Sequence, residues 1–192
     1  MRVPPIYAAD PFLVLQAALA APWLDLPMAV VTTGCEGWAL ALLAVALVWS
    51  LERHPGRTVA RVVPALLALL GAGLAVQVVK RLVASPRPLA VLGASRVHLV
   101  LEPLLANSFP SGHAAAAAAL AAALTLRYRG QVAWLWALAA VGGVSRVYVG
   151  AHWATDVAAG WALGAAVGLA AAVLLRGREP RLSTGKARLP AT

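Results

Sequence analysis

Charged residues are scarce in this chain of 192 residues. Lys, Arg, Asp and Glu together make up 12% of it, and only seven residues are acidic, whereas soluble domains contain about 25% charged residues. Hydrophobic residues make up 61%, and the mean hydropathy is +0.80. One soluble core could not bury this much Ala, Leu and Val. The composition therefore excludes an ordinary soluble domain and predicts a protein surrounded by lipid.

Cysteine occurs once, at Cys35, inside an apolar run. A single cysteine excludes an intrachain disulfide and leaves the redox compartment undetermined. The formal charge of +9 and the pI near 11.3 could indicate a nucleic-acid partner, but proteins that bind nucleic acid gather their basic residues on one solvated face. Here the basic residues lie mostly between apolar runs, as membrane topology requires, so we expect no nucleic-acid partner.

The apolar runs have the length of membrane-crossing helices, which need about 20 residues each. Five clear transmembrane spans are predicted, at residues 26–51, 60–84, 111–128, 131–147 and 153–175. A shorter run at 11–22, bracketed by prolines, predicts an N-terminal helix that lies in the interface or inserts into the membrane. The predicted fold class is all-α, a polytopic membrane helical bundle.

Three parts of the chain are expected from this pattern. Residues 1–25 form an N-terminal segment with the interfacial helix, and residues 26–175 form the membrane-embedded unit that carries the function. Residues 176–192 are basic and contain Pro and Gly, which predicts a disordered cytoplasmic tail.

The basic residues predict the orientation of the spans. With five spans, the N-terminus, the 85–110 loop and the 145–152 turn share one face, which carries six of the 16 Lys and Arg residues, and the other face carries the remaining ten. Cytoplasmic loops have an excess of Lys and Arg, so the face with ten should be cytoplasmic. The 85–110 loop should then face the periplasm or the exterior.

Two features lie inside the predicted spans. Gly160, Gly164 and Gly168 recur every four residues and predict a helical stripe where another helix packs closely. Glu36 lies about ten residues into the first span, where a charge is costly. Its carboxyl group either is neutral and bonded to a nearby threonine or lines the substrate path, and both interpretations stay open.

Polar side chains gather near the ends of several predicted spans, where ionisable residues are costly and by default mark function. They form three groups that the predicted topology places on one face: Lys80 with Arg87, then Ser111, Gly112 and His113, then Arg146 with His152 and Asp156. Although the groups are far apart in sequence, their convergence on one face predicts a single site.

Lys80, Arg87 and Arg146 would repel one another in one pocket unless an anion lay among them. Guanidinium groups bind phosphate oxygens through two parallel hydrogen bonds, and the prolines on both sides of Arg87 prevent its loop from becoming helical. Ser111 and Gly112 open a predicted helix, whose free N–H groups bind anions, and Gly112 lets the backbone approach closely. The pattern predicts a phosphate site.

His152 and Asp156 are four residues apart at the start of the last predicted span and therefore lie on one helical face. A carboxylate that holds one imidazole nitrogen leaves the other free to act as a nucleophile. His113 would protonate the leaving oxygen and later activate water. A structural hydrogen bond with no catalytic role is the alternative for His152 and Asp156.

Metal-assisted phosphoryl transfer usually relies on clusters of carboxylates, and Asp156 is the only acidic residue in the three groups. Three cationic side chains can neutralise the phosphoryl oxygens instead. We therefore expect a phosphatase with no metal and no cofactor that stays active in chelators. The alternative of a different class is a catalytically silent transporter or scaffold, which the lack of a convincing internal repeat disfavours.

The three groups resemble the signature of the type 2 phosphatidic acid phosphatase family. The signature reads Lys-x6-Arg-Pro, Pro-Ser-Gly-His and Ser-Arg-x5-His-x3-Asp, and the chain carries KRLVASPRP at 80–88, PSGH at 110–113 and SRVYVGAHWATD at 145–156. All eleven specified positions match, in order. The resemblance covers the chain from about residue 26 to 175.

The resemblance implies a role for each matched residue, in agreement with the reading above. His152 would be the phosphorylated nucleophile, Asp156 would orient it, and His113 would be the general acid. The remaining matched residues would bind the phosphoryl group: Lys80, Arg87, Ser111, Gly112 and Arg146.

The short linker between the first two motifs resembles that of small bacterial lipid phosphatases, which implies an enzyme of the bacterial inner membrane. We expect undecaprenyl diphosphate as the substrate, with phosphatidylglycerophosphate, phosphatidic acid and lipid A phosphates as the alternatives. The motifs bind the phosphate that these lipids share, so they determine neither the choice among them nor the oligomeric state.

Overall fold

The computed structural model describes residues 4–52, 55–101 and 107–175, and of residues 55–57 the backbone alone. All regular secondary structure in these ranges is helical, which confirms the all-α prediction for them. The tail predicted at 176–192 lies outside the described residues. With 3-10 helices written η, the elements are η1 (Pro5–Tyr7), α1 (Phe12–Leu19), α2 (Pro22–Gly34), α3 (Gly37–Glu52), α4 (Pro55–Leu82), α5 (Pro88–Leu92), α6 (Gly112–Tyr128), η2 (Arg129–Val132), α7 (Trp134–Tyr148) and α8 (Ala154–Leu175).

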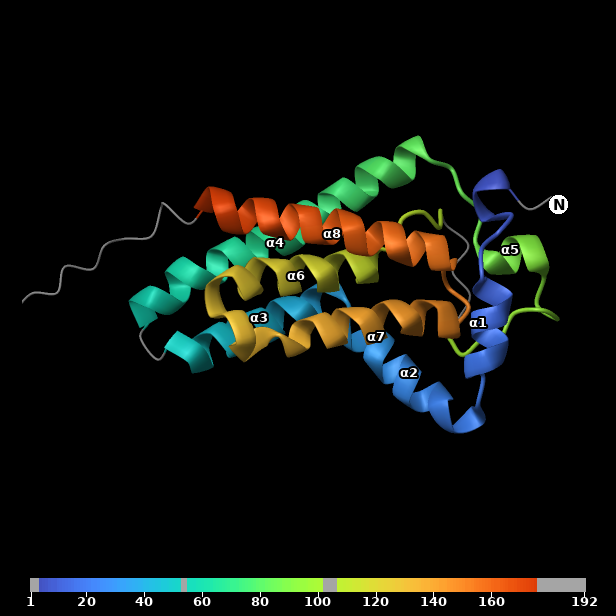
Figure 1. Cartoon of the computed structure of the whole chain (residues 1–192), viewed down its shortest axis with the longest axis horizontal. Coiled ribbons are helices and arrows are strands. Elements are labelled where there is room, and N and C mark those ends of the chain that lie inside the picture. The colour runs from blue at the N-terminus through green and yellow to red at the C-terminus, as the bar shows by residue number, and fades with distance from the viewer. Residues whose placement is uncertain (1–3, 53–54, 102–106, 176–192) are drawn as a thin grey trace, which may run out of the picture.

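Helix α6 lies in the middle of the bundle, in contact with α3, α4, α7 and α8 (Figure 1). Every residue from Ala114 to Leu124 is buried. An α-helix that is apolar all round is buried on all faces, and a run of alanines keeps α6 thin enough for its neighbours to approach. The Ser111–His113 group stands at the N-terminus of this enclosed helix.

The glycine stripe of α8 packs against α6, as its spacing predicts. A Cβ atom at Gly164 would overlap the carbonyl group of Ala115, and one at Gly160 would overlap that of Ser111. The two backbones are therefore in direct contact, which a larger side chain would prevent. This contact fixes the start of α8 beside the start of α6.

The single span predicted at 26–51 is wrong, because this stretch forms two helices. Helix α2 ends at Gly34 and α3 begins at Gly37, with Cys35 and Glu36 between them. Glycine destabilises a helix by about 0.5–1 kcal/mol relative to alanine, and the carboxylate of Glu36 has a polar partner at the break, the indole N–H of Trp38 (2.6 Å). Apolar composition alone does not reveal such a break.

By length and composition, two helical stretches are candidate membrane spans, Thr58–Leu82 and Ala154–Leu175. Helices α1 and α2 are bent by 118° at their junction and would make a third span together, and α3 is apolar but shorter. The described residues therefore support two or three spans, and the predicted five are not confirmed. Large apolar residues such as Trp23 and Leu82 are exposed, as in a protein surrounded by lipid.

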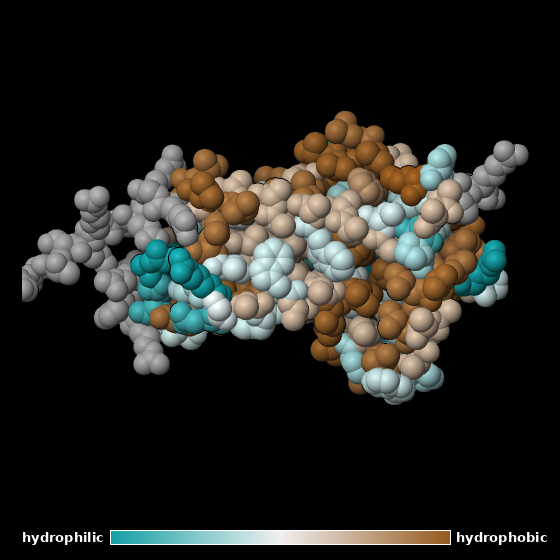
Figure 2. Space-filling model, viewed as in Figure 1, coloured by the Kyte–Doolittle hydropathy of each residue, from teal (hydrophilic) through white to brown (hydrophobic). Residues whose placement is uncertain are grey.

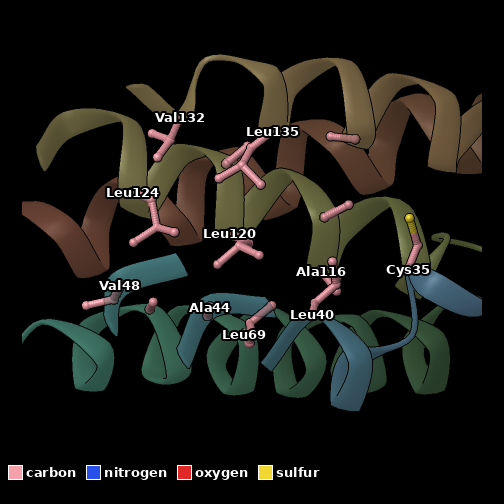
Figure 3. Packing of buried hydrophobic residues seen from close by; sticks show 14 of the residues in the cluster. Cys35, Leu40, Ala44, Val48, Leu69, Ala116, Leu120, Leu124, Val132 and Leu135 are labelled. Atoms are coloured by element: carbon pink, nitrogen blue, oxygen red, sulfur yellow. The ribbon is translucent and has the colours of Figure 1, made fainter. Parts of the chain in front are cut away.

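Two hydrophobic clusters stabilise the bundle. The larger one joins α3, α4, α6 and α7 through residues such as Leu40, Leu69, Leu120 and Leu135 (Figure 3). The smaller one lies at the end that carries the polar groups, where residues of the N-terminal segment pack against α6, α7 and α8. In Figure 2 the most hydrophilic residues gather toward the ends of the long axis, and apolar ones cover much of the surface between.

Candidate active site

The three predicted groups meet at one end of the bundle. Arg87 precedes α5, Ser111 is the N-cap residue of α6, and Arg146 lies in the last turn of α7. His152 follows in the turn before α8, and Asp156 lies in the first turn of α8. The N–H of Ser111 donates a hydrogen bond to the carbonyl oxygen of Asp156 (3.0 Å), which joins the second group directly to the third.

The imidazole of His152 lies between a carboxylate and a guanidinium group. Its Nδ1 is 3.3 Å from Oδ2 of Asp156, and its Nε2 is 3.4 Å from Nη1 of Arg87. The same Oδ2 accepts hydrogen bonds from the Ser108 hydroxyl (2.5 Å) and the Trp153 N–H (2.9 Å). With Nδ1–H directed at the carboxylate, the lone pair lies on Nε2, on the side of the cations.

The surroundings of His152 favour its neutral form. Its side chain is 3% exposed, and burial lowers its pKa from 6.5 to about 4. The hydrogen bond to Asp156 opposes this shift, and the charges of Arg87 and Arg146 add to it. At neutral pH the ring therefore carries an available lone pair.

Two buried guanidinium groups line the site. Arg87 donates from Nη1 to the carbonyl oxygen of Ala151 (2.6 Å), and Arg146 donates from Nη1 to the hydroxyl of Thr32 (2.8 Å). The Nε of Arg146 is buried and has no hydrogen-bond partner among the described residues. A buried polar group without a partner costs about 1–3 kcal/mol, and more when it is charged. An anion bound at this point would remove that cost.

Lys80 is held beside the same site through the backbone. Its ammonium group donates to the carbonyl oxygens of Asn107 (2.6 Å) and Ser108 (3.5 Å). Nη2 of Arg87 also lies 3.5 Å from the Asn107 oxygen. The structure thus brings the two cations of the first motif to one carbonyl group.

Ser111 and Gly112 begin α6 as predicted. The Ser111 hydroxyl accepts a long hydrogen bond from the N–H of Ala114 (3.5 Å), as an N-cap residue does. His113 lies in the first turn of α6 and lines a cavity together with Arg146. All eight predicted site residues therefore lie at one end of the bundle.

The cavity has a volume of about 350 Å³ and an apolar side. Leu89, Leu99 and Leu101 line it together with the polar residues. Glu36 also lines it, at the break between α2 and α3. Of the two interpretations of Glu36 left open above, a position on the substrate path fits this location.

Several polar residues of the site were missed by sequence reasoning. Ser108 binds Asp156, Thr32 binds Arg146, and Tyr7 and Ser85 form a hydrogen-bonded pair that reaches Asp156. The available signal was weak, since each is a single neutral residue that occupies none of the specified motif positions. Among the residues that the structure describes, no three His, Cys, Asp or Glu side chains are grouped to hold a metal ion.

Two named relatives share part of this chain. An undecaprenyl-diphosphatase from Sulfolobus acidocaldarius is 44% identical over 70 residues, which are 34% of this chain and 32% of the relative. A lipid A 1-phosphatase from Porphyromonas gingivalis is 42% identical over 67 residues, 33% of this chain and 15% of the relative. The chain thus matches at most a third of the length of these relatives.

Solved structures share most of the fold. Aquifex aeolicus LpxE superposes with a TM-score of 0.74 and 26% identity, over 88% of this chain and 98% of that one. A PAP2-type phosphatidylglycerolphosphate phosphatase from Bacillus subtilis superposes with a TM-score of 0.62 over 91% of this chain and 87% of that one, and at 23% identity it shows the fold alone.

A family model covers the part of the chain that holds the motifs. It describes the PAP2 superfamily and matches residues 61–179, which is more than half of the sequence and includes all three groups of polar residues. The resemblance noted in the motifs is thereby confirmed, and the chain belongs to the PAP2 superfamily.

Proposed function

We propose that this protein is an integral membrane phosphatase that removes the terminal phosphoryl group of a lipid phosphate or diphosphate, with His152 as the nucleophile. One observation carries the proposal. The Nε2 of a buried, neutral imidazole lies 3.4 Å from the Arg87 guanidinium group, the charge of Arg146 also acts on this ring, and Nε of Arg146 has no partner among the described residues. A phosphoryl group fits this arrangement because it offers oxygens to the cations and an electrophilic phosphorus to the imidazole.

The reaction would proceed in two steps. In the first, the lone pair on Nε2 of His152 forms a P–N bond to the terminal phosphorus, the P–O bond to the leaving lipid alcohol or lipid phosphate breaks, and protonated His113 gives its proton to the leaving oxygen. In the second, neutral His113 takes a proton from water, the hydroxide oxygen attacks phosphorus, and the P–N bond breaks to release inorganic phosphate and neutral His152. Asp156 would stabilise the charge on the His152 ring in both steps.

The cations would act on the phosphoryl oxygens. Arg87 and Arg146 would each offer N–H groups in pairs, and Lys80 would add a third positive charge. Ser111 and Gly112 would contribute donors at the start of α6. We propose that these charges suffice without a metal ion, so chelators should leave the activity unchanged.

For the substrate we propose undecaprenyl diphosphate, with phosphatidylglycerophosphate, phosphatidic acid and lipid A phosphates as alternatives. The relatives named undecaprenyl-diphosphatase and lipid A 1-phosphatase support a lipid-linked phosphate. The leucine-lined cavity beside His113 and Arg146 supports an apolar chain next to the reacting phosphate. The distribution of basic residues, counted over the five spans predicted from the sequence, supports an active site on the periplasmic or outer face of a bacterial inner membrane.

The test is phosphate release by the purified protein from this panel of lipids. His152→Ala should abolish release and should give no phosphoenzyme when the reaction is stopped by alkaline denaturation, which preserves a P–N bond, because the nitrogen that would form this bond is missing. His98→Ala is the matched control, since His98 also pairs with an aspartate, Asp25 (2.8 Å), but belongs to none of the motifs, and it should retain turnover. Turnover by His152→Ala would refute the nucleophile assignment.

A further inference from the structure

The N-terminal segment reaches into the site through Tyr7. This side chain is 2% exposed, and its hydroxyl donates to Oδ1 of Asp156 (2.9 Å). Its ring stacks on that of Trp153, with centroids 4.6 Å apart and an interplanar angle of 14°. Tyr7 and Asp156 are 149 positions apart in sequence, so this contact exists only in the folded protein.

Tyr7 and the other partners of Asp156 bind different oxygens of its carboxylate. The Tyr7 hydroxyl has one proton, which it donates to Asp156, so it accepts the proton of the Ser85 hydroxyl 2.5 Å away. The other carboxylate oxygen, Oδ2, takes Ser108, the Trp153 N–H and the imidazole. Tyr7 is therefore the side-chain donor seen at Oδ1, and it limits rotation of the carboxylate about its Cβ–Cγ bond.

Asp10 fastens the same segment to the start of α8. Its Oδ2 accepts hydrogen bonds from the N–H (2.8 Å) and the hydroxyl (2.7 Å) of Thr155, and its Oδ1 accepts from the N–H groups of Ala154 (3.2 Å) and Phe12 (2.9 Å). A carboxylate at this position stabilises the start of a helix by accepting from its free N–H groups. Tyr7 is thus fixed relative to the helix that carries Asp156.

We propose that Tyr7 is a positioning residue for phosphoryl transfer: its hydroxyl holds the Asp156 carboxylate in the orientation that keeps the His152 ring directed at the phosphoryl site. Asp10 binds the start of α8 and thereby fixes the N-terminal segment that carries Tyr7. This inference rests on the proposed function, because it acts through the nucleophile assigned there. It extends the site to the first ten residues, outside the matched region of the family model.

The hydrogen bond also sets the charge that His152 experiences. The titratable groups that act on this imidazole are the guanidinium groups of Arg87 and Arg146, the carboxylate of Asp156 and the imidazole of His113. A donor on the carboxylate withdraws part of its negative charge. Without the Tyr7 hydroxyl, the carboxylate should attract the proton on the ring more strongly, so His152 should become protonated at a higher pH.

The experiment is Tyr7→Phe in the full chain, assayed for kcat, KM and the pH profile of kcat/KM. This variant keeps the stacked ring and removes the hydroxyl alone. We expect kcat to fall ~10-fold, in line with residues that orient a reacting side chain, with KM within about twofold. The acid limb of the profile should move to higher pH.

Tyr148→Phe is the matched control. Tyr148 is also fully buried, but its hydroxyl donates to Asp25 (2.6 Å) and not to the site. It should leave kcat and the acid limb as in the unaltered protein. Equal losses in both variants would overturn the inference, because they would show a general effect of removing a buried hydroxyl. An unchanged kcat and acid limb in Tyr7→Phe would overturn it as well.

Two further variants keep the test decisive. If Tyr7→Phe does not fold, Ser85→Ala removes the donor to the Tyr7 oxygen and should move the acid limb in the same direction by a smaller amount, while an unmoved limb overturns the inference. His152→Ala separates the two proposals. If it is inactive while Tyr7→Phe is unaffected, the positioning role alone is wrong, and if it is active, both are wrong.

Discussion

Lowering the pH should destabilise this protein through His152. In the unfolded chain its imidazole takes up a proton near pH 6.5, whereas burial lowers its pKa in the folded protein to about 4. Between these values the unfolded state binds more protons, so stability falls as the pH falls. Above pH 6.5 the titration of His152 takes nothing from the free energy of unfolding. Between about pH 6.5 and pH 4 that free energy falls progressively, by about 3 kcal/mol in total.

The measurement compares the unaltered protein with His152→Asn, which cannot titrate. The free energy of unfolding of each, obtained by denaturant titration in micelles, should differ by a constant amount between pH 8 and 7. The difference should then shrink by about 3 kcal/mol as the pH reaches 4. A flat difference would refute the burial argument. A difference that grows as the pH falls would mean that the ion pair with Asp156 prevails over desolvation.

Three more predictions follow from the packing, the site and the topology. Gly164→Val should destabilise the protein by more than about 2 kcal/mol in denaturant titration, since its side chain would overlap α6, while Gly73→Val, which meets open space, should not; equal effects would contradict the packing argument. His113→Ala should slow release from a lipid phosphate far more than from a substrate with a very good leaving group, and equal losses would count against a general acid. In intact cells, Ala94→Cys should react with an impermeant thiol reagent, and Gln131→Cys, which is exposed in η2 at the C-terminal end of α6, should not; reversed labelling would place the site in the cytoplasm.

The helical boundaries were predictable where local chemistry sets them. The helix predicted at 60–84 ends before Pro86 and Pro88, and the one predicted at 111–128 begins at Gly112 with Ser111 as its N-cap residue. Prolines and cap residues act within a few positions, so a sequence displays them directly. The break at residues 35–36 has a weaker local signal, since two glycines and one glutamate interrupt an otherwise apolar run.

The partners of the site could not be predicted from spacing. Ser108 and Tyr7 both donate to Asp156, yet neither belongs to a periodic pattern or a motif. Tyr7 precedes the apolar run at 11–22, for which composition alone predicts an interfacial helix. The burial of Tyr7 depends on where the ends of α7 and α8 lie in three dimensions.

The sequence alone predicted a lipid environment, the helical class and the side chains of the proposed site, because hydropathy and residue type are local properties. The spacing of four residues also predicted that His152 and Asp156 pair, although His152 lies in the turn before α8 and not on its helical face. Only the tertiary structure decided that Arg87 lies 3.4 Å from the His152 ring and that residues 7 and 10 complete the site. Those contacts join segments far apart along the chain, and close packing of α6 against α8 sets their distances.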